Sequence, residues 1–349
     1  MAARTLSGLA RHPPPRISLA RLPTPLQPLD RLHAETGGPR IWVKRDDLSE
    51  SGASGNKIRK LEFTLAEARA RGADTLITCG GLQSNHCRAT ALLGAKLGFA
   101  VELLLRGVPQ GLADGNLFLD ELAGATVHAF AVERYQRELP ALLEAAAAAV
   151  RSRGGTPFVI PTGASDGIGV WGYVTAAAEL QSDFREAGIQ PRHVVVATGS
   201  GGTQAGLTAG FACLGEDIAV HGVAVCDDAG YFRAKVLADL GDWVSRYGVD
   251  LDLGQLRIST LDGYIGPGYG KAQPGVLETI RRLARLEGLL LDPVYTDKAF
   301  YGLLSELAAG RLRDAADIVF VHTGGVFGLF AQRAELMGGT ANEEPRQAR

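Results

Sequence analysis

A lysine at the start of an expected helix is the first residue that could do chemistry. Lys57 begins a segment, residues 57–71, whose apolar side chains recur at helical spacing. The positive end of the helix dipole lies there, so a cation at that place needs another explanation. A lysine with a depressed pKa is a nucleophile that forms an imine with an aldehyde. Position alone leaves open whether Lys57 is such a nucleophile or a solvated helix lysine, and Lys60 is predicted to be solvated.

A second candidate site follows the strand-like residues 75–78. The chain there runs through two glycines into a helix whose first turn holds Ser84 and Asn85. Free backbone N–H groups at a helix start, together with a hydroxyl and an amide, suit a carboxylate. Ser84 could equally be a simple N-cap of that helix. His86 stands beside Cys87, but no third ligand lies at a useful spacing, so we predict no metal site.

A glycine-rich loop, from Gly199 to Gly206, follows the apolar residues 193–197. A strand, glycine loop and helix start form a cradle of backbone N–H groups for an anion, to which Thr203 adds a hydroxyl. The loop is not a dinucleotide fingerprint, because Gln204 stands where the third glycine is required, and it lacks the Gly-Lys-Ser/Thr of a P-loop. It predicts binding of a phosphate carried by something other than a dinucleotide, with a tight structural turn as the alternative.

Two tyrosines stand in loops outside the expected core segments. Tyr269 lies in the glycine-rich stretch 266–270, and Tyr295 follows the apolar run 289–291. Binding residues are concentrated on loops, where a tyrosine can present its hydroxyl group. Each tyrosine taken alone is as consistent with packing as with function.

These loops must be positioned by alternating strands and helices. Such alternation predicts an α/β fold with a parallel sheet and helices on both faces. Ligands of open α/β sheets bind beyond the carboxyl ends of the strands, where the loops described above lie. The expected strands are 41–44, 75–78, 100–105, 126–130, 158–160, 193–197, 220–225 and 318–321, and the expected helices are 57–71, 84–97, 116–123, 139–153, 169–186 and 203–214.

The composition is that of an ordinary globular protein. The 349 residues are 46% hydrophobic and 21% charged, with a net charge of −2, and this length suits about two domains. No basic stripe favours nucleic acid, and no apolar stretch is long enough for a membrane span. Four cysteines without a C-x-x-C pair indicate reduced thiols and a cytoplasmic protein. Arginines from Arg4 onward precede the first acidic residue, which would allow an organelle presequence, but they flank no apolar signal core. A polar tail follows Gly339.

Taken together, the loops resemble those of a known enzyme group. The order of motifs is similar to that of the pyridoxal-phosphate enzymes of the D-cysteine desulfhydrase and 1-aminocyclopropane-1-carboxylate (ACC) deaminase group. The resemblance covers residues 22–329. The motifs are Lys-Arg-Asp-Asp at 44–47, Gly-Asn-Lys-x-Arg-Lys-Leu-Glu at 55–62, Gln-Ser-Asn-His-x-Arg at 83–88, Gly-Ser-Gly-Gly-Thr at 199–203, Asp-Pro-Val-Tyr at 292–295 and His-Thr-Gly-Gly at 322–325.

The resemblance implies a fold and a role for each motif. The fold is tryptophan-synthase-β-like (type II), with two open, twisted parallel-sheet domains and the cofactor between them. Residues 1–56 and 170–349 would form the larger, cofactor-binding domain, and residues 57–169 the smaller one. Lys57 would hold pyridoxal 5'-phosphate covalently and later move protons, and a homodimer is expected. The phosphate would lie on Gly199, Ser200, Gly201, Gly202 and Thr203.

The remaining implied roles concern the ring and the substrate. Asn85 would bond the cofactor's ring hydroxyl, and Ser84 would meet the substrate carboxylate. Ser84, Tyr269 and Tyr295 would share in catalysis. Together with Asn85 and His86, these three residues would bind a small amino-acid substrate.

Position 296 separates the two branches of the group. In ACC deaminases the residue after the loop tyrosine is a glutamate at the cofactor's ring nitrogen, whereas here it is Thr296, as in the desulfhydrases. A carboxylate there supports the strong electron sink that opening a cyclopropane needs, and a neutral hydroxyl supports a weaker one that suffices to expel sulfide. We therefore expect conversion of D-cysteine to pyruvate, sulfide and ammonia, with ACC deaminase or L-cysteate sulfo-lyase as alternatives. Asp297, in place of the usual glycine, departs from both branches.

Two interpretations from other classes explain less. Residues 163–167 fit the Gly-x-Ser-x-Gly elbow of a serine hydrolase, with Ser165 as nucleophile and His322 late in the chain. That interpretation leaves Lys57 and the glycine cradle unexplained, and the resemblance assigns the 163–167 loop to the substrate-side wall. A non-catalytic sensor would have no need for an imine-forming lysine.

Overall fold

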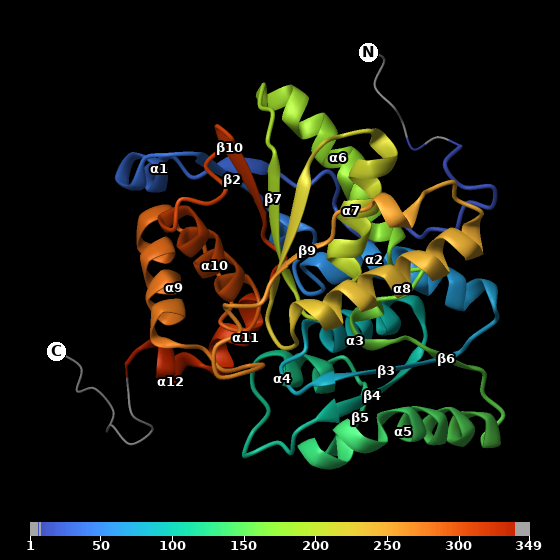
Figure 1. Ribbon diagram of the computed structural model, residues 1–349. Coiled ribbons are helices and arrows are strands. Elements are labelled where there is room, and N and C mark those ends of the chain that lie inside the picture. Colours follow the sequence, from blue (N-terminus) through green and yellow to red (C-terminus); the bar gives the residue numbers. More distant parts are fainter. Residues whose placement is uncertain (1–5, 7, 339–349) are drawn as a thin grey trace.

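Two β-sheets organise the computed structural model of the protein, which describes residue 6 and residues 8–338 (Figure 1). Arg4 and the predicted polar tail after Gly339 lie outside the described residues. The larger sheet contains, in spatial order, β1 (Leu26–Pro28), β2 (Arg40–Lys44), β10 (Asp317–Val321), β7 (His193–Thr198), β8 (Ala219–Ala224) and β9 (Ser259–Leu261). The smaller sheet contains β5 (Thr126–Phe130), β4 (Ala100–Arg106), β3 (Thr75–Gly81) and β6 (Pro157–Val159).

Both sheets are parallel, as the alternation of elements predicts, apart from one edge. Strand β1 pairs antiparallel with β2, whereas all other neighbouring strands run parallel. Neither β1 nor β9 is among the predicted strands, because both are short and contain no buried residue, so they show no apolar run. The strands of the smaller sheet all fall within residues 57–169, and the strands of the larger sheet all fall outside that range.

Helices cover both faces of the larger sheet, as the side chains of its central strand show. All six residues of β7 are buried. Val194 and Val196 pack in one core cluster with α6 (Trp171–Ala187) and α7 (Gly202–Leu214). Val195 and Ala197 pack in another, with α9 (Pro274–Glu287) and α10 (Thr296–Ala308). Because successive strand residues point to opposite faces, a continuous apolar strand means helices on both sides, and Figure 1 shows them there.

The remaining helices follow the predicted alternation with two differences. The helix predicted for 139–153 begins earlier, at Val132, because Tyr135 is the one buried residue of its first two turns and gives little periodic signal. The prediction also lacks six helices: α1 (Asp30–Thr36), α8 (Ala229–Tyr247), α9, α10, α11 (Val326–Ala331) and α12 (Arg333–Leu336). None of the helices in the described part of the chain combines the length and apolarity that crossing a bilayer requires. The other helices are α2 (Asn56–Ala70), α3 (Asn85–Leu97), α4 (Gly115–Leu122) and α5 (Val132–Ser152).

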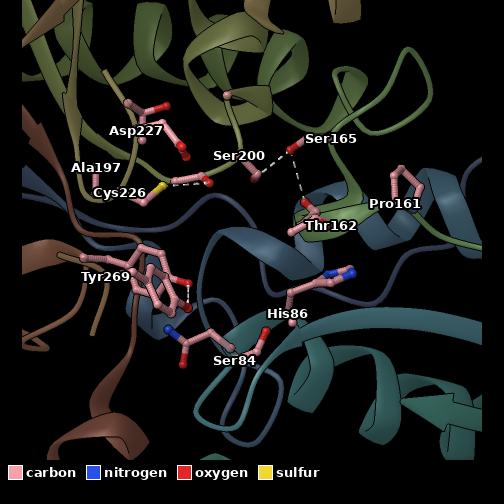
Figure 2. A pocket seen from close by; sticks show the side chains of 18 of the residues that line it. Ser84, His86, Pro161, Thr162, Ser165, Ala197, Ser200, Cys226, Asp227 and Tyr269 are labelled. Atoms are coloured by element: carbon pink, nitrogen blue, oxygen red, sulfur yellow. Dashed lines mark hydrogen bonds between the residues drawn. The ribbon is translucent and has the colours of Figure 1, made fainter. Parts of the chain in front are cut away.

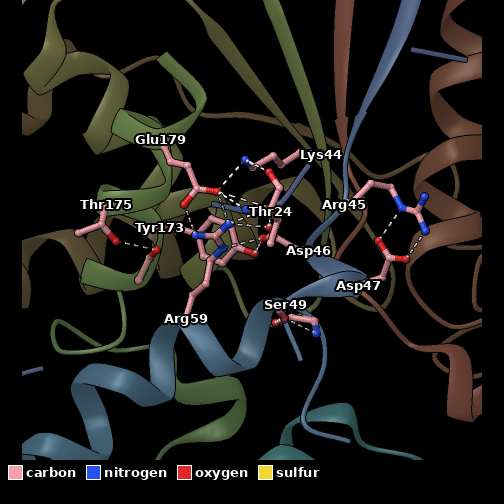
Figure 3. A network of polar contacts seen from close by, with 12 residues as sticks. Thr24, Lys44, Arg45, Asp46, Asp47, Ser49, Arg59, Tyr173, Thr175 and Glu179 are labelled. Carbon is pink, nitrogen blue, oxygen red and sulfur yellow. Dashed lines mark hydrogen bonds and ion pairs between the residues drawn. The ribbon is translucent and has the colours of Figure 1, made fainter. Parts of the chain in front are cut away.

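A buried ionic network ties together the two helices that connect the sheets (Figure 3). Arg59 on α2 bonds Asp46 at 2.8 and 3.0 Å and Glu179 on α6 at 2.8 and 2.9 Å. Lys44, at the end of β2, reaches Glu179 at 2.6 Å, and Tyr173 donates to Asp46 at 2.5 Å. Removing one partner of such a buried set costs about 3–5 kcal/mol, because the other charges are left unpaired. The network therefore fixes the first turn of α2, where Lys57 stands.

Candidate active site

A cavity of about 530 Å³ lies where loops of the two sheets meet (Figure 2). Its walls come from the chain after β3, the chain after β7, the first turn of α2 and the loops that carry the two tyrosines. Two residues of the predicted site, Gly202 and Thr296, are not among the lining residues. The predicted residues that line the cavity are Lys57, Ser84, Asn85, His86, Gly199, Ser200, Gly201, Thr203, Tyr269 and Tyr295.

Lys57 is the second residue of α2 and faces this cavity. Burial lowers the pKa of its amine from 10.5 to about 8, against a smaller opposing effect of Cys87. Its Nζ makes no hydrogen bond to any described residue. The helix can start here because Gly55 has a φ of 104°, and a Cβ at that position would stand 2.4 Å from the carbonyl oxygen of Thr323. A buried amine that is partly neutral near pH 8 and open to a cavity is a nucleophile.

Ser84 caps helix α3 and also lines the cavity, and its contact with a substrate carboxylate stays a prediction. Its Oγ accepts a hydrogen bond from Cys87 N at 3.2 Å, which leaves its own proton free to donate. The backbone N–H groups of Asn85 and His86 have no acceptor among the described residues. These donors, at the positive end of a 13-residue helix, suit a carboxylate.

The imidazole of His86 is engaged at the back of the cavity. Its Nε2 lies 2.8 Å from Thr78 Oγ1, and the Thr78 hydroxyl donates its only proton to the Ile160 carbonyl at 2.8 Å. Nε2 must therefore carry the proton, and burial together with Lys57 and Lys60 holds the pKa of this imidazole well below its usual value. Figure 2 shows the ring turned toward Thr162 and away from Tyr269. Its Nδ1 has no hydrogen-bond partner among the described residues, and the predicted substrate contact of His86 stays a prediction.

Asn85 is oriented by two residues that the sequence analysis did not select. Its Oδ1 accepts from Arg88 Nη1 and from Asn116 Nδ2, both at 3.0 Å. Because a guanidinium can only donate, the amide oxygen must face Arg88, and the Nδ2 donor is left for a ligand in the cavity. Arg88 belongs to the Gln-Ser-Asn-His-x-Arg motif and could have been considered from it, whereas Asn116, from α4, has no signal in the sequence.

The glycine loop after β7 forms the predicted cradle. Helix α7 begins at Gly202, and its N-cap, Gly201, has a φ of 83° that favours glycine. The backbone N–H groups of Ser200, Gly201 and Thr203 have no acceptor among the described residues, and the loop lines the cavity. Thr203 Oγ1 accepts from Asn56 at 3.0 Å and so keeps its proton to donate. Such a set of N–H and O–H donors at a helix start fits a phosphate group.

Lys60 and Ser165 pack against the cradle, and the burial of Lys60 contradicts the prediction that it is solvated. Lys60 is fully buried rather than solvated, and its Nζ bonds Ser165 Oγ at 3.1 Å. Ser165 Oγ is 2.8 Å from Ser200 Oγ and accepts from Gly202 N at 3.2 Å. The 163–167 loop thus supports the glycine cradle, and Gly163 and Ser165 also line the cavity, so the substrate-side role that the resemblance implies stays a prediction. Lys60 is three residues from Lys57 on one helix face, a spacing that could have indicated its position.

The serine hydrolase interpretation fails because its histidine is engaged elsewhere. The Nε2 of His322 lies 2.9 Å from the Leu290 carbonyl, and its Nδ1 accepts from Gly324 N at 3.2 Å. Neither nitrogen contacts Ser165, whose hydroxyl is surrounded by Lys60, Ser200 and Gly202 N–H instead.

Tyr269 and Tyr295 form another wall of the cavity, and their hydroxyl groups are hydrogen-bonded to each other. Their rings stand edge to face, with centroids 5.8 Å apart. Burial raises the pKa of Tyr269 to about 12 and that of Tyr295 well above its usual value, so both hydroxyls stay protonated. One proton is used between the two oxygens, and the other is available to donate to a ligand.

Thr296 stands behind Tyr295 and not in the cavity wall. Its hydroxyl donates to Asp292 Oδ1 at 2.7 Å and accepts from Asp292 N at 2.8 Å. Asp297 is buried as well, its carboxylate has no hydrogen-bond partner among the described residues, and burial beside Asp292 raises its pKa well above the usual value. The Thr296 hydroxyl has already donated its proton to Asp292, so it could meet a cofactor ring only as an acceptor. That contact stays a prediction.

The residues that line the cavity indicate what kind of molecule it binds. A nucleophilic amine, Lys57, and a donor cradle for phosphate, Gly199–Thr203, line one cavity between two α/β sheets. An amine binds an aldehyde and the cradle binds a phosphate, so the cavity fits a small phosphorylated aldehyde. Asn85 adds a donor, fixed by Arg88, for an oxygen on such a molecule. Among the described residues, no group of three or more His, Cys, Asp or Glu side chains is placed to hold a metal ion.

The chain belongs to the pyridoxal-phosphate dependent enzymes, whose family model matches residues 17–324. It is 39% identical over 345 residues to the mitochondrial bifunctional D-cysteine desulfhydrase/1-aminocyclopropane-1-carboxylate deaminase of Arabidopsis thaliana, covering 95% of this chain and 84% of the relative. It is 40% identical to the D-cysteine desulfhydrase of Salmonella paratyphi A, covering 91% and 96%. The solved structure of an ACC deaminase homologue superimposes with a TM-score of 0.86 at 37% identity, covering 95% of this chain and 98% of that one.

These comparisons confirm the predicted fold, cofactor and enzyme class. The cofactor is pyridoxal phosphate. The solved structure of O-ureido-L-serine synthase, at 17% identity and a TM-score of 0.62, shares the fold alone.

Proposed function

We propose that this enzyme converts D-cysteine and water to pyruvate, hydrogen sulfide and ammonia. Pyridoxal phosphate, when bound, supplies a ring that withdraws electrons and stabilises negative charge on the substrate α-carbon. Lys57 would hold the cofactor in the resting enzyme and then, once released, take the α-proton on its Nζ. The pKa of about 8 supports that role, because a neutral amine is a proton acceptor near the operating pH of most enzymes.

Ser84 and the start of α3 would hold the substrate carboxylate. The Ser84 proton and the two free N–H groups of Asn85 and His86 provide three donors on one side of the cavity. Fixing the carboxylate there orients the bond to the α-hydrogen relative to Lys57. The Asn85 amide, held by Arg88 and Asn116, would donate to the oxygen on the cofactor ring.

Tyr269 and Tyr295 would occupy the side of the substrate's β-carbon. Because both hydroxyls stay protonated, the free proton of the pair can be donated to the departing sulfur. Loss of the α-proton and of sulfide leaves aminoacrylate, which hydrolyses after release to pyruvate and ammonia. No oxidant or metal enters this balance.

The observation that carries the choice of D-cysteine is the residue at position 296. Thr296 is neutral, fully buried and bonded to Asp292, so this position presents no carboxylate to the cofactor. Expelling a thiolate needs less charge stabilisation on the substrate than opening a cyclopropane does. The relative from Salmonella, a D-cysteine desulfhydrase, agrees with this choice.

ACC deamination to 2-oxobutanoate and ammonia is the second candidate. Two of the compared proteins favour it, the bifunctional enzyme of Arabidopsis thaliana and the ACC deaminase homologue of known structure. L-Cysteate sulfo-lyase activity is a third, since it differs only in the leaving group and the configuration. We further propose that the enzyme is a cytoplasmic homodimer, which sedimentation of the purified protein would test for its subunit number.

The test is a substrate panel on one purified preparation. D-cysteine, L-cysteine, ACC and L-cysteate are offered at equal concentration, and pyruvate, 2-oxobutanoate, sulfide and sulfite are measured. We expect the highest kcat/KM with D-cysteine, with sulfide and pyruvate formed in equal amounts. Faster formation of 2-oxobutanoate from ACC would reject the argument from Thr296 and make the deaminase the assigned function.

A further inference from the structure

One arginine in the cavity wall has no role in the scheme above. Arg106 is the last residue of β4, pairs in register with Gly81 and lines the cavity. Its guanidinium carbon lies 4.6 Å from the centroid of the Tyr269 ring. It forms no hydrogen bond or ion pair with any of the described residues. An arginine has five donors, so this group can still bind a ligand through all of them.

The other cations in and around the cavity are already engaged. Lys235 pairs with Asp239 and donates to the Ser165 carbonyl. Lys298 donates to two backbone carbonyls at 2.7 Å, and Arg88 is used on Asn85 and Asn116. Lys57 is reserved for the reaction. Within the described structure, Arg106 is therefore the uncommitted cation of the cavity.

Arg106 stands on the tyrosine side of the cavity. A Cβ built on Gly81, its partner in the strand pairing, would lie 3.3 Å from a ring carbon of Tyr269. Gly81, Arg106 and Tyr269 thus form one continuous piece of wall. Ser84 and the free N–H groups of α3 already provide the donors that a carboxylate needs. The free guanidinium is left for a second negative group on the same substrate.

We propose that Arg106 is the leaving-group subsite and makes the enzyme selective for substrates with an anionic sulfur group on the β-carbon. This rests on the proposed function, β-elimination on a cysteine-like amino acid. The Cβ–S bond breaks, and its electron pair stays on sulfur, while the α-proton moves to Lys57. From cysteate the departing group is sulfite; from a cysteine thiolate the departing sulfur takes the free proton of the Tyr269–Tyr295 pair and leaves as hydrosulfide. The guanidinium stabilises the charge of the departing group through charge-assisted hydrogen bonds.

Variants of Arg106 in the cofactor-loaded enzyme test this assignment. Arg106→Gln should lower kcat/KM for D-cysteine by ~10- to 100-fold, the range that loss of a charged hydrogen bond produces. Arg106→Lys should recover part of that loss, because the charge remains. Arg134→Gln is the matched control, since Arg134 also stacks on an aromatic ring, Phe130, with its guanidinium carbon 5.3 Å from the centroid, but does not line the cavity.

A binding measurement separates this assignment from the proposed reaction. D-alanine has no β-substituent and D-cysteate carries a β-sulfonate, and their initial binding is followed by the cofactor absorbance in a stopped-flow instrument. We expect the wild type to prefer D-cysteate, and Arg106→Gln to lose that preference while binding D-alanine within about twofold of the wild type. An equal loss for both ligands would make Arg106 a carboxylate ligand and overturn the proposal. An unchanged preference for D-cysteate in Arg106→Gln would also overturn the proposal.

The two hypotheses fail in different ways. If wild-type enzyme releases no sulfide from D-cysteine but the preference for D-cysteate depends on Arg106, the proposed function is wrong and the subsite stands. If sulfide release is fast in wild type and unchanged in Arg106→Gln, the function stands and the subsite is wrong.

Discussion

The reactivity of Lys57 with pH gives the sharpest test of the site. Burial lowers the pKa of its amine from 10.5 to about 8, which corresponds to roughly 3 kcal/mol in favour of the neutral form. At pH 8 about half of this amine is neutral, against ~0.3% for an ordinary lysine. In the cofactor-free protein, Lys57 should therefore react with a small acylating reagent ~100-fold faster at pH 8 than a lysine in solution of equal intrinsic nucleophilicity.

Competitive acetylation with peptide mass spectrometry measures this lysine by lysine. A trace of acetic anhydride is added to the cofactor-free protein between pH 6.5 and 11, and the label on each lysine peptide is quantified. Lys96, which is exposed at the end of α3, provides the reference inside the same molecule. The labelling of Lys57 should rise through a midpoint near pH 8, since the neutral amine is the reactive form.

The lowered pKa of Lys57 also determines how the stability of the cofactor-free protein changes with pH. Between about pH 8 and pH 10.5 the unfolded chain holds a proton on Lys57 that the folded chain lacks. Stability of the cofactor-free protein should therefore gain from this group as pH rises through that window, relative to Lys57→Met. A labelling midpoint for Lys57 at or above 10.5 would refute the reasoning, because the amine would then be hydrated in the cavity and the nucleophile would have to be sought elsewhere.

Three further substitutions test the cradle, position 296 and the ionic network. Gly201→Asp should weaken cofactor binding by at least ~100-fold in an absorbance titration, because it brings a negative charge to the phosphate site. Gly98→Asp is the control, since Gly98 has nearly the same backbone φ, 81° against 83°, and this variant should leave cofactor binding intact. Thr296→Glu, which crowds a carboxylate against Asp292 and Asp297, should destabilise the fold by about 3–5 kcal/mol in denaturant unfolding, whereas Thr296→Ser should be nearly neutral. An unchanged midpoint in the Glu variant would show that the site tolerates a third acid. Arg59→Leu should lower the free energy of unfolding by about 3–5 kcal/mol in the same assay, and Arg71→Leu, at an exposed position, by at most about 1 kcal/mol. Similar losses in both variants would show that the ionic network does not stabilise the fold.

Thr296→Glu also shows where an argument from the sequence needed the structure. From the sequence alone, this substitution would convert one branch of the family toward the other. In the folded protein the hydroxyl of Thr296 completes the Asp292 cap of α10, and Asp297 is already a buried acid. A third carboxylate there changes the stability of the fold before it changes the chemistry.

The sequence by itself determined the alternation of elements and the chemistry of the loops. Periodicity reports which residues of a strand or helix are buried, so β3, β7 and α2 were predicted within a few residues. A glycine loop that starts a helix binds anions wherever it stands, and Gly199–Thr203 could be identified without knowing its neighbours.

Only the tertiary structure decided which side chains meet. Lys57 and Ser200 lie 143 positions apart in the sequence and share one cavity because the first turn of α2 and the loop after β7 meet where the two sheets face each other. The contact of Lys60 with Ser165, the bond from Thr78 to Ile160 that fixes the proton of His86, and the orientation of Asn85 by Asn116 all depend on segments that are distant in the chain. Local patterns carry no record of such contacts, because hydrogen bonds and desolvation depend on what surrounds a side chain and not on which residues precede it.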